Sequence, residues 1–93
     1  MSDEQITMEI RHIQDPGHGW IAVNLDQQME LGISEADMTP YSYTDKYGTI
    51  FAEEDCDAAH VFNAAKARGI DLDIQYVEVN RMSVIRNMRR CGE

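Results

Sequence analysis

The chain has 93 residues, two cysteines and a formal net charge of −9 at pH 7. A chain of this length forms one small domain, and its acidic charge disfavours direct binding to nucleic acid or to an anionic membrane. Two cysteines are too few for a disulfide framework, no apolar run approaches the roughly 20 residues that cross a bilayer, and the N-terminal MSDEQ lacks the layout of a signal peptide. We therefore expect a soluble, cytoplasmic protein that makes no membrane contact.

The first third of the chain predicts two strands and a short helix. Apolar and polar side chains alternate over residues 5–13, and residues 20–25 (WIAVNL) suit a second strand. The connecting segment 15–19 (DPGHG) consists of turn-forming residues, so the two strands should pair antiparallel. A short helix is expected near 26–31, ended by Gly32.

Residues 41–69 contain the clearest pattern of the sequence. Short β-prone segments on either side of the DKYG turn (45–48) predict a β-hairpin. An apolar stripe with helical spacing then predicts a helix over 56–68, with Asp55 as its N-cap and Gly69 at its end. The stripe consists of Ala58, Val61, Phe62 and Ala65.

The end of the chain predicts one more strand and a basic arm. From residue 70 to residue 79, apolar side chains alternate with polar ones. The chain carries sixteen acidic and four basic side chains before residue 81, whereas residues 81–93 carry four arginines against Glu93. The arm could bind an anionic surface, fold back on the acidic body, form a short amphipathic helix or remain loosely attached.

This order of elements predicts an α+β fold. Residues 1–80 should form a single domain with an antiparallel sheet of about four to five strands and with the helix 56–68 packed on one face, while the other face stays largely exposed. Residues 81–93 would follow as a basic C-terminal arm. The large side chains expected in the core are Trp20, Phe51, Phe62 and Tyr76.

Few residues are suited to catalysis or metal binding. Cys56 and His60 share one face of the predicted helix, and His12 or His18 could supply a third metal ligand, but neither a CxxC nor an HxxxH pair exists. Cys56 also lies at a predicted helix N-terminus, although the acidic residues around it disfavour a thiolate. We therefore predict no catalytic residue, no metal site and no cofactor.

The acidic run at residues 53–57 is the strongest candidate for an interaction site. Together with two aspartates near residue 72, it could form a negative face that mimics spaced phosphates and occupies a basic groove on another protein. Helix capping explains Asp55 and Asp57 equally well, and solubility explains the overall charge. Two nearby tyrosines could add an aromatic binding patch or simply cover the sheet. The candidate partner-binding residues are Glu53, Glu54, Asp55, Asp57, Asp71, Asp73, Tyr41 and Tyr43.

Five short segments, taken together, resemble a family of small uncharacterised proteins from phages, plasmids and related mobile elements of bacteria. The segments are GHGWIAV (17–23), LGI (31–33), YSY (41–43), EEDCD (53–57) and IRN (85–87). The family has no assigned activity, so the resemblance implies no catalytic residue. It does imply a context in which small acidic proteins act on host machinery, for example as inhibitors of restriction or CRISPR complexes, some of them as nucleic-acid mimics.

Residues and resemblance together lead to one expectation and two alternatives. We expect a non-enzymatic binding protein whose acidic face docks on a basic, nucleic-acid-binding surface of a host complex. The first alternative is a structural or regulatory module that forms a homodimer or larger oligomer through a sheet edge or the segment 81–90. The second alternative is a small metal-dependent enzyme that uses Cys56, His60 and His18.

Overall fold

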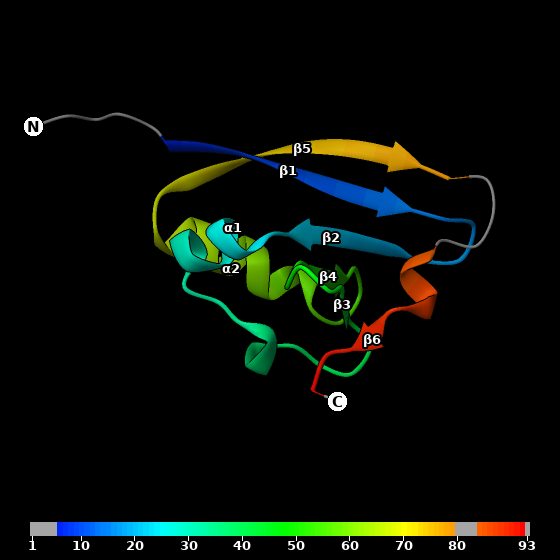
Figure 1. The fold of residues 1–93 in the computed structure, drawn as a ribbon. Coiled ribbons are helices and arrows are strands. Elements are labelled where there is room, and N and C mark those ends of the chain that lie inside the picture. Colours follow the sequence, from blue (N-terminus) through cyan, green and yellow to red (C-terminus); the bar gives the residue numbers. More distant parts are fainter. Residues whose placement is uncertain (1–5, 80–83, 93) are drawn as a thin grey trace, which may run out of the picture.

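The computed structural model describes residues 6–79 and 84–92, which form a six-stranded sheet with two α-helices (Figure 1). The strands are β1 (Ile6–Gln14), β2 (Gly19–Val23), β3 (Tyr43–Thr44), β4 (Ile50–Glu53), β5 (Ile70–Glu78) and β6 (Arg89–Arg90). The helices are α1 (Leu25–Leu31) and α2 (Ala58–Ala67), with single 3-10 turns at η1 (Glu35–Asp37) and η2 (Val84–Asn87). No helix within these two ranges is both long enough and apolar enough to cross a membrane.

The sheet has the strand order β5-β1-β2-β4-β3-β6. The predicted α+β class is confirmed, but the sheet has more strands than expected and is mixed, because β5 pairs with β1 in parallel over nine positions. The cause is the connection through α2. Since α2 returns the chain along one face of the sheet, β5 starts at the same end as β4 and runs parallel to it and to β1.

The main core lies between the sheet and α2. Strand alternation directs Met8 and Ile10 toward this layer, and α2 contributes Val61 and Ala65. The helix begins at Ala58, two residues later than predicted. The prediction of a core position is wrong for two residues. Phe62 lies at the border of the apolar stripe and is 39% exposed, and Tyr76 lies near the end of β5 and is 71% exposed.

A smaller core covers part of the opposite face, which the sequence had predicted to be largely exposed. Trp20, Ala22 and Phe51 pack there against Ile85 of η2. Beyond η2, β6 pairs antiparallel with β3 and becomes the sixth strand. Residues 84–92 therefore fold back on the body, and a loosely attached arm does not describe this segment. Residues 81–83 and 93 lie outside the described part of the chain.

Helix α1 closes the end of the sheet where β2 stops. Asn24 forms a capping box with Gln27, and Gly32 ends the helix in the left-handed conformation, at φ 70°. The Gln28 side chain donates to the carbonyl oxygens of Val23 at 2.8 Å and of Gly48 at 2.7 Å. These two bonds hold α1 against β2 and the turn of the β3–β4 hairpin.

Candidate functional site

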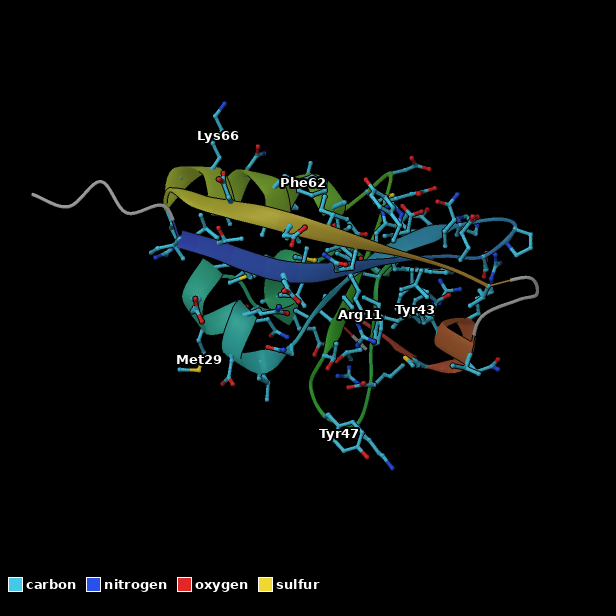
Figure 2. All side chains as sticks on the ribbon, turned by 90° about the horizontal axis from the view of Figure 1, so that it is seen from above. Arg11, Met29, Tyr43, Tyr47, Phe62 and Lys66 are labelled. Atoms are coloured by element: carbon cyan, nitrogen blue, oxygen red, sulfur yellow. The ribbon has the colours of Figure 1, made fainter. Side chains whose placement is uncertain are left out.

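A pocket of about 560 Å³ opens where the β1–β2 turn, the β3–β4 hairpin and the C-terminal segment meet. Trp20, Tyr41 and Tyr43 supply its aromatic walls. Tyr41 lies in the turn before β3 rather than in a strand, and its side chain is 62% exposed. Figure 2 shows Tyr47 at the tip of the hairpin, well away from Tyr43. Tyr41 and Tyr43 therefore line the same pocket, but they do not share one face of a strand.

Two arginines of the C-terminal segment also line this pocket. Arg86 donates two hydrogen bonds of 2.8 Å to the buried carboxylate of Asp15, and its guanidinium lies 5.7 Å from the centre of the Trp20 ring. The hydrogen bond to Asp15 raises the pKa of Arg86. Arg90 lies 5.8 Å from the centre of the Tyr43 ring. Two arginines of the same chain therefore lie over the rings of Trp20 and Tyr43. In the sequence, the only indication of these contacts was the cluster of arginines near the C-terminus.

Glu53 lies in the pocket wall but is almost fully buried. One of its carboxylate oxygens accepts hydrogen bonds from the backbone N–H groups of Asp55, at 2.8 Å, and Cys56, at 2.9 Å. The other oxygen lies 3.4 Å from Nδ1 of His18. Glu53 therefore fixes the turn before α2 and contributes little to the exposed charge.

Asp57 is completely buried at the N-cap position of α2, and its side chain does not cap the helix. Its carboxylate accepts hydrogen bonds from the backbone N–H of Thr39, at 2.9 Å, and from the hydroxyl groups of Thr39, at 2.8 Å, and Ser42. Ser42 in turn accepts a bond from the Glu53 N–H at 2.9 Å. Two expectations are corrected: Asp55 is not the N-cap, and Asp57 is not part of an exposed face.

The proposed metal ligands are not brought together. Cys56 and His18 line the pocket, whereas His60 is exposed on α2 and does not line the pocket. Across residues 6–79 and 84–92, the metal-capable groups close enough to share an ion are the carboxylates of Glu53, Glu54 and Asp55, within 4.8 Å of one another. The backbone bonds to Glu53 already explain why this cluster forms.

Cys56 is poorly suited to act as a nucleophile. Desolvation raises the pKa of its thiol, and the hydrogen bond to Glu53 and the nearby carboxylates act in the same direction. A raised pKa leaves less thiolate, which is the reactive form. The pocket therefore does not assemble an activated cysteine.

A separate acidic surface lies on β1 and β5. Asp71 and Asp73 are exposed on the face of β5 opposite α2, and the parallel register places Glu9 of β1 directly beside Asp73. We call Glu9, Asp71 and Asp73 the acidic strip. The sequence identified the two aspartates, but not Glu9, because the β1–β5 register could not be predicted.

The remaining predicted acidic residues lie elsewhere. Asp55 is exposed at the pocket, and the half-buried Glu54 has a carboxylate oxygen 3.5 Å from Nε2 of His12. The single acidic face expected from the sequence is therefore divided between the pocket and the acidic strip.

Comparisons with protein-family models, curated proteins and solved structures found no match to this chain. The functional inference therefore depends on geometry and charge.

Proposed function

We propose that this protein is a non-enzymatic binding protein whose acidic strip docks on a basic surface of a partner protein. The observation that carries the proposal is the alignment of Glu9, Asp71 and Asp73, all exposed, on one face of two adjacent strands. Arg11 is the one lysine or arginine within β1 and β5. Three carboxylates against one guanidinium give this part of the sheet a negative potential that would attract a basic surface.

The spacing of the strip supports a partner that normally binds nucleic acid. Asp71 and Asp73 are two positions apart on a strand, which places them about 6.6 Å apart along its axis. A row of negative charges along an extended backbone has the general character of a nucleic-acid strand. The net charge of −9 would speed the encounter with a basic groove.

A finer version of the proposal concerns the biological setting. The resemblance to proteins of phages and other mobile elements supports a bacterial nucleic-acid-handling complex as the partner, and inhibition or modulation of that complex as the outcome. The raised pKa of Cys56 and the separation of His60 from the pocket support the non-enzymatic part of the proposal.

The test is affinity capture from a bacterial lysate at two salt concentrations. The bait would be the tagged wild-type protein, the variant Asp71→Asn/Asp73→Asn, and the control Asp26→Asn/Glu30→Gln. The control removes the same charge from exposed positions of α1. We expect a nucleic-acid-binding protein to be captured by the wild type and the control at about 50 mM salt, and to be lost at about 500 mM salt or with the strip variant. Equal capture by all three proteins at both salt concentrations would refute the acidic-strip mechanism.

A further inference from the structure

We infer that the outer edge of β5 receives an extended segment of the partner, which adds a seventh strand to the sheet. This inference rests on the proposed function and specifies the chemistry of the partner. The segment would carry basic side chains on one face and apolar side chains on the other. The argument depends on the open edge, on the direction of its backbone groups and on the side chains of its two faces.

Among residues 6–79 and 84–92, no strand, helix or loop pairs with the long outer edge of β5. β5 is the last strand of the sheet, and its nine residues pair on one side only, with β1, among the residues that the structure describes (Figure 1). Proteins usually protect such an edge with a short strand, a proline, charged side chains (lysine above all) or a bulge. β5 has no proline, and its register with β1 is continuous. Its exposed charges, Asp71, Asp73 and Glu78, are all negative, so they disfavour an acidic strand but attract a basic one. It therefore offers a complete template for strand addition.

The register shows which backbone groups are available. The Val79 N–H donates to the Gln14 carbonyl oxygen at 2.9 Å. In a parallel ladder, alternate residues of a strand direct both backbone groups to the same neighbour. The odd-numbered residues of β5 therefore bond with β1, and the N–H and C=O groups of Leu72, Ile74 and Tyr76 point outward. These three residues can exchange hydrogen bonds with an incoming strand.

The two faces of β5 determine the chemistry of that strand. Side chains at neighbouring positions of paired strands lie on the same face, so residues opposite Asp71 and Asp73 would lie beside two exposed carboxylates. On the other face, Leu72 and Ile74 are only half-buried and Tyr76 is exposed. Apolar side chains of the incoming strand would cover this apolar border. Alternating basic and apolar residues satisfy both faces.

Charge favours a partner over a second copy of this chain. Two copies joined through β5 would place two acidic strips at one interface, and each chain carries a net charge of −9. Like charges at close range disfavour such a dimer. A basic segment gains the attraction that a second copy lacks.

The test uses a short peptide in which lysine and valine alternate. Binding to the isotopically labelled protein would be followed by NMR, together with hydrogen exchange of the backbone amides. We expect protection of the amides of Leu72, Ile74 and Tyr76, and an affinity that falls as salt is raised. A peptide with the same sequence but N-methylated at alternate residues keeps the charge and blocks strand pairing, so it should bind at least about tenfold more weakly.

A pair of variants at one position isolates the backbone contribution. Tyr76→Pro removes an outward N–H without removing a hydrogen bond to β1, whereas Tyr76→Ala removes the same ring and keeps the N–H. We expect weaker peptide binding for Tyr76→Pro than for Tyr76→Ala.

Three outcomes would overturn strand addition. They are equal binding of the N-methylated peptide, protection confined to residues outside β5, or a homodimer that occupies this edge by light scattering and NMR. If the lysate partner still depends on Asp71 and Asp73 in any of these cases, the proposed function survives and only the docking geometry is wrong. If replacing both aspartates does not change capture of the partner, the proposed function itself is wrong.

Discussion

Arg86 and Asp15, 71 positions apart in the sequence, form an ion pair with two hydrogen bonds of 2.8 Å. The same carboxylate accepts the backbone N–H groups of Gly17 and His18, both at 2.9 Å. One buried side chain thus joins the β1–β2 turn to the C-terminal segment. The pair holds η2 over Trp20 and helps to close the smaller core.

Replacing Arg86 should destabilise the protein, because it leaves the buried Asp15 carboxylate without two charge-assisted hydrogen bonds. We expect Arg86→Gln to lower the thermal unfolding midpoint by roughly 5 °C or more. The matched control Arg90→Gln removes the same charge from an exposed residue and should have a smaller effect. In a double-mutant cycle, Asp15→Asn and Arg86→Gln should be non-additive. Additive effects, or equal midpoints for both arginine variants, would contradict this role.

The C-terminal segment should contribute to the core and not only to the surface. Ile85 is 2% exposed within the smaller core, whereas its neighbour Val84 is 72% exposed. Ile85→Ala should therefore lower the free energy of unfolding by about 2–5 kcal/mol. Val84→Ala should change it by less than about 0.5 kcal/mol. Chemical denaturation of both variants measures the difference, and similar values would show that residues 84–92 do not pack as described.

The attachment of β6 should depend on pH through Glu35. Hydrogen bonds from the Arg89 side chain and from the Gly92 N–H lower the pKa of this carboxyl below its usual value of 4.5. Since the ionised form is favoured in the folded protein, its stabilisation is present above pH 4.5 and is lost as the pH falls through the lowered pKa. The stabilisation is small, because the pair is partly exposed.

Thermal unfolding of Glu35→Gln provides the measurement. The variant should unfold roughly 1–4 °C below the wild type near pH 7, and the gap should narrow at a pH well below 4.5, where the carboxyl becomes protonated. Glu30→Gln, at an exposed position of α1, is the matched control and should show no such gap. A gap for Glu35→Gln that is the same at both pH values would rule out the carboxylate as its source.

The two cysteines should differ sharply in reactivity. Cys91 is fully buried, and burial raises the pKa of its thiol to about 11, whereas Cys56 is exposed. Iodoacetamide at about pH 8 should slowly modify Cys56 in the folded protein and reach Cys91 only after unfolding. Mass spectrometry of the wild type and of Cys56→Ser reads out both sites. Modification of Cys91 in folded Cys56→Ser at the rate seen after unfolding would be inconsistent with its burial.

Local patterns predicted the elements whose determinants are close in sequence. The hairpin was expected from the turn at 45–48, and its Asp45 carboxylate accepts the backbone N–H groups of Tyr47 and Thr49. Gly32 and Gly69 both follow a helix, as the sequence predicted, and the structure gives both a positive φ. The parallel pairing of β1 with β5 was missed, because it joins segments separated by more than 60 residues and depends on the path of α2.

The candidate site was predicted only where strand alternation determines exposure. Asp71 and Asp73 alternate with apolar residues, and both are exposed as expected. Glu53 and Asp57 belong to a run of acidic residues, and the local sequence does not show which of these side chains are buried. Their burial depends on backbone N–H groups and hydroxyl groups of other segments, which tertiary packing brings to them.

The central claim is most directly tested by the salt dependence of partner binding. The dissociation constant of the captured partner would be measured by calorimetry between about 50 and 500 mM salt, for the wild type and for Asp71→Asn/Asp73→Asn. We predict that wild-type affinity falls steadily as salt rises, and that the variant binds more weakly with a shallower salt dependence. If wild-type affinity is unchanged over this range and the variant binds as tightly, the acidic strip is not the docking surface.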